Sequence, residues 1–163
     1  MARKAKTESP YAEWTNSLGY LVRKSFRSVS RALEARTSEY GVTAAQWHFL
    51  RVLWIEDGIS QRELSQRVNM REPTTVIAVK RLEKADLITR KQSTEDARKI
   101  NVYLTPKAKR LKAKLMPLVE EVNDLATQGM TAKEKSELRR LLSKVNQNLE
   151  AEDSRRNTPV PPP

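Results

Sequence analysis

The sequence has 163 residues, enough for one domain with a buried core, and its net charge of +11 favours a polyanionic partner, nucleic acid rather than membrane. Without cysteine the chain has no disulfide, thiolate sensor or cysteine-ligated zinc, and one histidine argues against a histidine-rich metal site. No apolar run approaches the ~18 residues of a membrane span, and neither a signal peptide, a nucleophile–base spacing nor a glycine-rich phosphate loop is visible. We therefore expect a cytoplasmic protein without enzymatic activity, metal or cofactor.

The first part of the chain predicts a basic arm followed by a long helix. Residues 1–10 are expected to be disordered. The helix should begin at Tyr11 or Ser17 and end at Tyr40, because Gly41 favours a helix end. Its apolar stripe consists of Leu18, Val22, Phe26, Val29 and Leu33.

Next, Thr43 and Gln46 have the spacing of a capping box and begin another helix. Its buried side is expected to be Trp47, Leu50, Leu53 and Trp54.

Residues 60–84 have the pattern of two short helices joined by a tight turn. Ser60 and Glu63 form a second capping box, residues 69–71 turn the chain, and Pro73 suits a first helical turn. The apolar spacing turns Thr75, Ala78, Val79 and Leu82 inward. The outward face is then methyl-rich and basic, as a major groove requires: Thr74, Val76, Ile77, Lys80 and Arg81.

Two strands with a polar tip are predicted directly after these helices. Residues 87–90 and 100–104 alternate with period two, and residues 91–99 between them are too polar to be buried. The alternative for residues 60–84 is one more helical hairpin of a bundle, but the strands favour a wing. Helix, turn, helix and wing in that order are typical of a duplex-DNA reader whose basic tip enters the adjacent minor groove.

From Val42 to Leu111 the chain resembles the MarR (multiple-antibiotic-resistance regulator) family, winged-helix bacterial transcription factors that work as homodimers. The matching segments are Val42 to Trp47, Gln61 to Ser65, Arg81 to Lys84, Leu87 to Arg90, Asp96 to Arg98 and Leu104 to Lys107.

The resemblance implies that Asp96 braces the wing while Arg98 points into the minor groove; the alternative is an exposed ion pair of little energetic value. Asp86 and Ala108 stand where the family usually has glycine. Val76 and Ile77 stand where polar or arginine side chains are common. The expected DNA-binding set is Arg71, Pro73, Thr74, Thr75, Val76, Ile77, Lys80, Arg81, Asp96 and Arg98.

The last part of the chain predicts two helices that flank the DNA reader. One follows Thr105 and Pro106 with an apolar seam; the other begins at a third capping box, Thr131 with Glu134. The seam residues are Leu111, Leu115, Leu118, Val122 and Leu125, and the last helix carries Leu138, Leu141, Leu142, Val145 and Leu149. Residues 151–163 should form a disordered Pro-rich tail.

We thus expect a mainly α fold with a small β-wing: a single winged-helix domain over residues 11–150. Within it, residues 43–104 are the DNA-binding unit, and residues 11–40 and 106–150 are dimerisation helices. An intramolecular three-helix bundle is the alternative to pairing with a second copy.

The resemblance also implies an effector, because in similar proteins small aromatic acids or coenzyme A thioesters bind beside the dimerisation helices and reduce DNA affinity. Phe26, Trp47 and His48 could wall such a site, with Arg23 and Arg27 as anion partners. Core packing of the aromatic residues and DNA or solvent contacts of the arginines are alternatives. The predicted function is a ligand-responsive repressor that binds a pseudo-palindromic operator as a homodimer; the alternative is a sequence-indifferent architectural DNA-binding protein.

Overall fold

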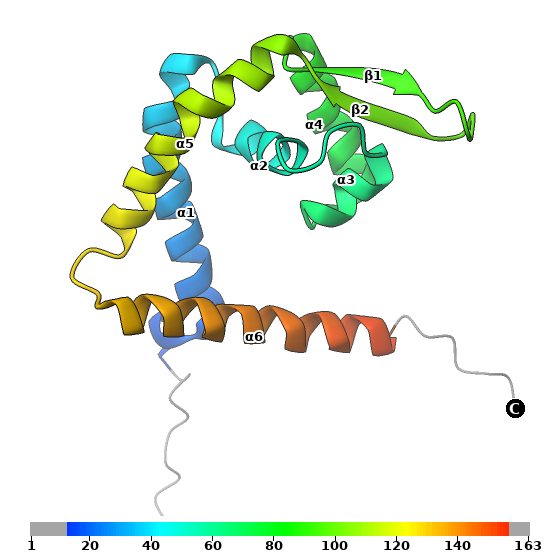
Figure 1. The fold of residues 1–163 in the computed structure, drawn as a ribbon. Coiled ribbons are helices and arrows are strands. Elements are labelled where there is room, and N and C mark those ends of the chain that lie inside the picture. The colour runs from blue at the N-terminus through cyan, green and yellow to red at the C-terminus, as the bar shows by residue number, and fades with distance from the viewer. Residues whose placement is uncertain (1–12, 157–163) are drawn as a thin grey trace, which may run out of the picture. The chain divides into compact units, whose positions relative to one another are not determined.

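The computed structural model describes residues 13–156, so the basic arm expected over 1–10 lies outside the described residues (Figure 1). The elements are η1 (Trp14–Asn16), α1 (Leu18–Thr37), η2 (Ser38–Tyr40), α2 (Ala44–Leu53), α3 (Gln61–Arg67), α4 (Glu72–Lys84), β1 (Ile88–Gln92), β2 (Ile100–Leu104), α5 (Pro106–Ala126) and α6 (Ala132–Arg156). Helices with a two-stranded wing confirm the predicted fold class.

Contacts within the chain group it into two units, residues 1–123 and 124–163, where one domain was expected over 11–150. The second unit contains α6, for which no buried side chain is found among its described residues. None of the described helices is long and apolar enough to cross a bilayer.

All three predicted capping boxes are present and fix where their helices begin. At α2 the Thr43 N–H donates to Gln46 Oε1 (2.9 Å) and the Gln46 N–H donates to Thr43 Oγ1 (3.2 Å). Ser60 and Glu63 make the same exchange at α3. Each box satisfies backbone donors that a helix start leaves unpaired.

The wing is an antiparallel hairpin in which Ile88 pairs with Leu104 and Gln92 with Ile100. The loop before α3 attaches it to the helices: the Gly58 N–H donates to the Val102 carbonyl (3.0 Å), and the Leu104 N–H donates to the Asp57 carboxylate (2.7 Å). The hairpin is therefore held at its base, and its tip extends from the helices (Figure 1).

One core joins the winged-helix elements to α5 and the end of α1. Fully or almost fully buried members are Val42, Trp47, Phe49, Leu50, Leu53, Leu64, Val79, Leu82, Leu87, Ile88, Val102, Ala108, Leu115 and Val122. Each large apolar side chain buried there contributes about 1.5–3 kcal/mol to stability.

The predicted apolar seam of α5 does not all face outward. Leu115 and Val122 were expected to face a second copy, but both are buried in this chain's own core. A heptad-like spacing marks an apolar face and does not say which surface covers it. Leu125, Leu141 and Leu142 are exposed in the isolated chain and remain candidates for an interface.

The two departures from the family's glycines are accommodated locally. Asp86 adopts the left-handed conformation that glycine favours, with φ of 56°, and its carbonyl accepts the Thr105 hydroxyl (2.9 Å). Ala108 is fully buried, and its carbonyl accepts Trp54 Nε1–H (3.0 Å).

The C-terminal tail is shorter than predicted, because α6 extends to Arg156. Residues 151–156 were assigned to a disordered tail, which is wrong for this segment. Neither glycine nor proline interrupts it before Pro159, and alanine, glutamate and arginine are good helix formers. Residues 157–163 lie outside the described part of the chain.

Candidate nucleic-acid interface

The candidate interface is built on α4, whose buried side fixes which residues face outward. Thr75, Val79 and Leu82 are buried, so Thr74 and Ile77 lie on the opposite, exposed side. Lys80 and Arg81 are exposed as predicted, as are Arg71 and Pro73 at the start of the helix, while Val76 is half-buried.

Thr75 requires a correction, because it was included among the DNA-contacting residues. Its side chain is fully buried, and its hydroxyl oxygen has no hydrogen-bond partner among the described residues. The position follows from the same periodicity that turns its neighbours Thr74 and Val76 away from the core. Thr75 therefore supports α4 from inside.

The turn between α3 and α4 sets the angle at which α4 is presented. Asn69 has φ of 53°, the Ser65 hydroxyl donates to the Met70 carbonyl (2.9 Å), and Arg62 pairs with Glu72 at 3.5 Å. These contacts join the end of α3 to the start of α4. The turn is thus determined by side chains as well as by backbone.

At the wing tip Asp96 organises the loop around Arg98. Its carboxylate accepts the Arg98 backbone N–H (3.0 Å) and Arg98 Nε–H (3.2 Å). These hydrogen bonds, the backbone one first, hold the pKa of the Asp96 carboxyl below its usual range. The Arg98 side chain is 92% exposed, so its charge is available to a partner while its backbone is fixed.

The wing is also tied directly to α4, through a pair that sequence reasoning missed. Glu83 Oε2 accepts hydrogen bonds from Arg90 Nε (3.0 Å) and Nη2 (2.6 Å). The hydrogen bond from Arg90 lowers the pKa of the Glu83 carboxyl. Two opposite charges seven residues apart on different elements have no sequence pattern that predicts an ion pair. The fold brings them together, and the pair orients β1 on α4.

A groove of about 470 Å³ runs between the wing and the starts of α3 and α4. Arg62, Arg98 and Lys99 line it together with Glu72 and Asp96. The groove therefore joins the two parts of the predicted DNA-reading surface. Arg62 and Lys99 could not be predicted as members from the sequence, because the helix and the wing meet only in the fold.

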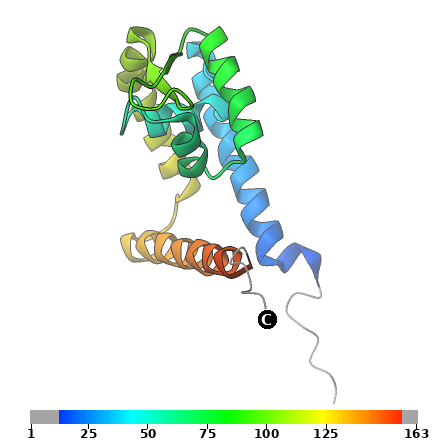
Figure 2. The same ribbon diagram turned by 90° about the vertical axis from the view of Figure 1, so that its right-hand side faces the viewer.

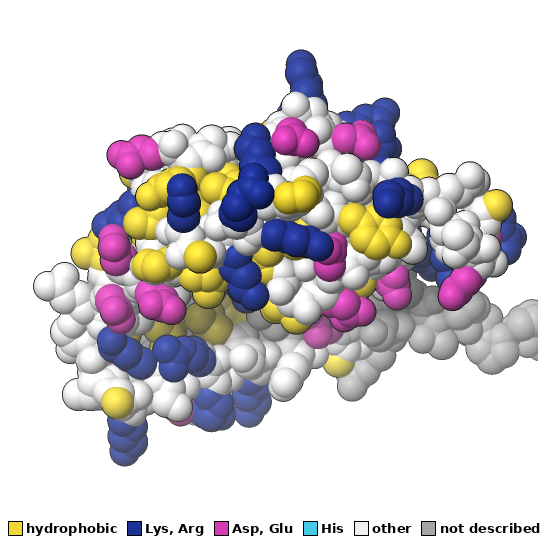
Figure 3. Space-filling view, turned by 45° about the horizontal axis from the view of Figure 1, so that its top comes forward, with side chains coloured by type: hydrophobic (Ala, Val, Ile, Leu, Met, Phe, Trp, Pro, Cys, Tyr) yellow, Lys and Arg dark blue, Asp and Glu magenta, His cyan; other side chains and the backbone are white. Residues whose placement is uncertain are grey.

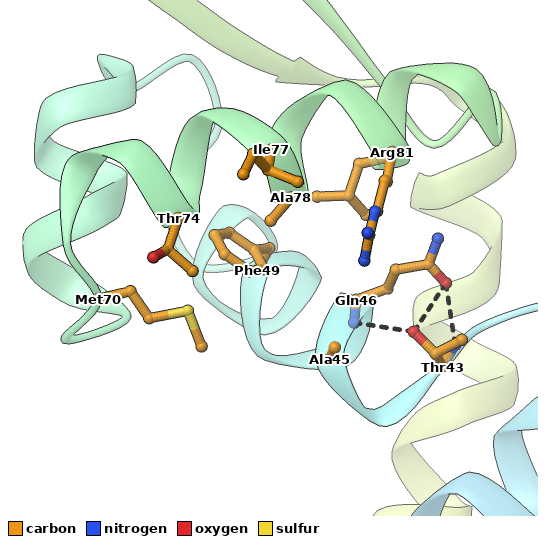
Figure 4. Close-up of a pocket in the computed structure, with 10 residues that line it drawn as sticks. Thr43, Ala45, Gln46, Phe49, Met70, Thr74, Ile77, Ala78 and Arg81 are labelled. Atoms are coloured by element: carbon orange, nitrogen blue, oxygen red, sulfur yellow. Dashed lines mark hydrogen bonds between the residues drawn. The ribbon is translucent and has the colours of Figure 1, made fainter.

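A second, largely apolar hollow of about 340 Å³ lies between α2 and α4 (Figure 4). Phe49 and Met70 contribute apolar surface, and Thr74, Ile77 and Arg81 reach it from the exposed side of α4. Three residues predicted to face DNA thus also line this hollow.

The predicted effector residues are divided between separate places: Trp47 lines a hollow of about 420 Å³ between α2 and α5, where Lys112 also lies. Phe26 stacks on His48 with ring centroids 5.9 Å apart, whereas Trp47 is buried and meets Trp54 edge to face. Arg23 and Arg27 line a separate hollow on α1. Burial, and then the charge of Arg51, lower the pKa of His48.

Among the described residues, no group of three or more histidine, aspartate or glutamate side chains is placed to hold a metal ion.

Comparisons with known proteins agree with this geometry. Residues 42–100 match the model of the MarR family. The HTH-type transcriptional regulator TtmR of Methylorubrum extorquens (strain PA1) is 29% identical over 136 residues, which cover 83% of this chain and 69% of that protein.

Two solved structures are similar over nearly their whole length. A mutant MarR from E. coli, complexed with operator DNA, has a TM-score of 0.76 at 25% identity, covering 84% of this chain and 98% of that one. BpsR of Bordetella bronchiseptica, whose DNA binding is regulated by 6-hydroxynicotinic acid, has a TM-score of 0.75 at 22% identity, covering 82% and 96%.

Proposed function

We propose that the chain is a member of the MarR family of DNA-binding transcriptional regulators and acts as a homodimeric repressor of a pseudo-palindromic operator. The observation that carries the proposal is the shared orientation of α4 and the wing. The Glu83–Arg90 pair holds them together, with the α4 residues Thr74 and Ile77 exposed and Arg98 exposed at the wing tip.

Each exposed group has a role that its chemistry supports. Thr74 can hydrogen-bond a base edge and Ile77, 55% exposed, can contact a thymine methyl in the major groove. Lys80 and Arg81 neutralise phosphates. Arg98 enters the minor groove, where narrow A·T tracts concentrate negative potential.

Dimerisation is proposed through the exposed apolar residues of the terminal helices. Leu18, Val22 and Val29 of α1 are exposed in this chain, as are Leu138 and Leu142 of α6. Exposed apolar side chains that recur along one helix are typical of an interface. Two-fold symmetry would place two α4 helices about 34 Å apart, one turn of DNA.

Protection footprinting on genomic fragments at ~0.15 M salt tests the proposal. We expect a protected site with two related halves. Uniform coverage without a symmetric site would favour the alternative, a sequence-indifferent architectural protein, which the net charge of +11 alone would also support.

An effector is part of the proposal: a small anionic aromatic acid, or its coenzyme A thioester, that releases the DNA. The hollow between α2 and α4 supports it, since apolar walls at Phe49 and Met70 stand beside the cation of Arg81. Because Thr74 and Ile77 line the hollow and face DNA, a ligand there would compete with DNA for the same residues. The regulation of BpsR by 6-hydroxynicotinic acid gives a first compound to try.

Thermal-shift and operator-release screens with aromatic acids and their coenzyme A thioesters test the effector and its site. A binding compound should stabilise the DNA-free protein, and Arg81→Ala should abolish that stabilisation while Arg23→Ala and Arg27→Ala keep it. Loss in the Arg23 and Arg27 variants alone would move the site to α1. No response to any compound would leave a constitutive regulator.

A further inference from the structure

One face of α1 carries four cations that the DNA-reading surface does not use. Arg23, Lys24, Arg27 and Arg31 are exposed and, with Tyr20, line one shallow hollow of about 200 Å³. We call these four residues the α1 basic face.

The α1 basic face lacks compensation within the described residues. None of its four cations forms an ion pair with a described carboxylate, and residues 18–33 contain no aspartate or glutamate. Like charges three and four residues apart on a helix destabilise it by about 0.2–0.5 kcal/mol per pair. The Lys24 ammonium lies 5.8 Å from the centre of the Tyr20 ring, and Arg31 donates to the Ser28 hydroxyl (3.4 Å), but neither contact supplies a negative charge. A bound polyanion would therefore relieve the repulsion.

The cations of α5 provide a contrast. Lys and Arg side chains spread over the face of the molecule drawn in Figure 3. On α5, Lys109 pairs with Asp57 at 2.9 Å, and Lys107 donates to the Ala85 carbonyl (2.8 Å). These lysines bind a carboxylate or a backbone carbonyl outside α5, whereas the two contacts named for the α1 basic face stay within α1.

The spacing and chemistry of the face suit a phosphate backbone. Arg23, Arg27 and Arg31 recur every four residues, about 6 Å apart along the axis, and span about 12 Å. Over that length one DNA strand presents about three to four phosphates. Arginine binds phosphate with two parallel hydrogen bonds, and the Tyr20 hydroxyl adds a donor at the same hollow.

The opposite face of α1 argues against a membrane surface as the partner. A membrane-bound amphipathic helix inserts its apolar face into lipid. Here that face is partly occupied by the protein, because Phe26 stacks on His48 and Leu33 is buried in the core. A nucleic-acid backbone is therefore a better partner for the α1 basic face than a membrane surface.

The α1 basic face also lies apart from the operator-reading surface. The N-terminal turns of α1 extend away from α3, α4 and the hairpin in two perpendicular views (Figures 1 and 2). DNA held by α4 and the wing therefore does not follow the axis of α1.

We propose that the α1 basic face binds the phosphate backbone of a second duplex segment while α4 and the wing hold the operator, so that the protein bridges two stretches of DNA. The inference rests on the proposed DNA-binding function, but it concerns a surface separate from α4 and the wing.

A capture assay tests the bridge. The full chain is loaded on an immobilised duplex that carries the footprinted site, and a labelled duplex without the site is added. The triple variant Arg23→Ala, Arg27→Ala, Arg31→Ala should protect the operator as before and capture the second duplex far more weakly. The salt slope of capture should fall by about 2.7, since each lost phosphate contact removes about 0.9.

The matched control removes three exposed cations of α6 instead, through Lys133→Ala, Arg139→Ala and Lys144→Ala. It carries the same net charge as the test variant and should retain capture. Capture retained by the α1 variant, or lost equally in both, overturns the proposal. So does a wild-type protein that protects the operator but captures phosphatidylserine vesicles and no second duplex. Alanine is a strong helix former, and the operator footprint reports whether each variant is folded.

Discussion

Replacing Arg98 by alanine should weaken operator binding in a salt-dependent way without altering the stability of the fold. The side chain is 92% exposed and hydrogen-bonds to the Asp96 carboxylate, so truncation removes little that the folded chain uses. Because the homodimer carries two wings, two fewer counterions are released, which lowers the slope of log affinity against log salt by about 1.8. Over a fourfold increase in salt, the ratio of wild-type to variant affinity should therefore fall about 12-fold.

Fluorescence anisotropy with an operator duplex at 50 and 200 mM salt measures this ratio. Arg139→Ala in α6 is the control, since it removes an equal and exposed charge from a helix that is not part of the proposed reading surface. An Arg98→Ala protein whose affinity and salt slope equal those of the control would refute the placement of the wing on DNA.

Three further predictions concern stability and assembly. Gly58→Ala should lower the free energy of unfolding by about 2–4 kcal/mol in urea titration, because φ is +83° and the new Cβ would lie 2.6 Å from Tyr103 Cε1. Gly41→Ala, where φ is also positive but the Cβ meets open space, should lose only about 1–2 kcal/mol, and equal losses would show that the Tyr103 contact has no effect. Leu142→Asp should give a folded monomer in sedimentation, because an unpaired charge in an interface costs several kcal/mol, whereas a full-affinity dimer would move Leu142, 41% exposed, out of it. Burial lowers the pKa of His48, so the imidazole binds a proton more readily in the unfolded chain, and the free energy of unfolding should fall as pH drops below about 6.5. His48→Gln should make this pH dependence flatter, and an unchanged pH dependence would show that His48 is not its source.

Local signals in the sequence were sufficient for most helix boundaries. The capping boxes at Thr43, Ser60 and Thr131 each involve residues three apart, and their partners are present in the fold. The inward positions of Val79 and Leu82 follow from helical periodicity alone.

Features that depend on tertiary packing could not be predicted in the same way. The spacing of Leu115 marks an apolar face, yet its covering surface is the chain's own core. Trp47 is largely buried and lines a hollow between α2 and α5 that Phe26 does not share, and the hollow beside Phe49 forms only when α4 packs across α2. Helical periodicity correctly predicted that Thr75 faces inward. It was nevertheless included among the DNA contacts because of its residue type, and that assignment was wrong.

Site-directed DNA cleavage tests the central claim most directly, because a chain without cysteine accepts a single cleaving group at a chosen position. An iron chelate attached through Glu95→Cys at the wing tip should cut operator DNA at two symmetric positions flanking the protected centre. The same group on Lys144→Cys in α6 should give no positioned cuts. Cleavage spread evenly along the fragment, or two positioned cuts from α6 and none from the wing, would contradict the proposed reading of DNA by α4 and the wing.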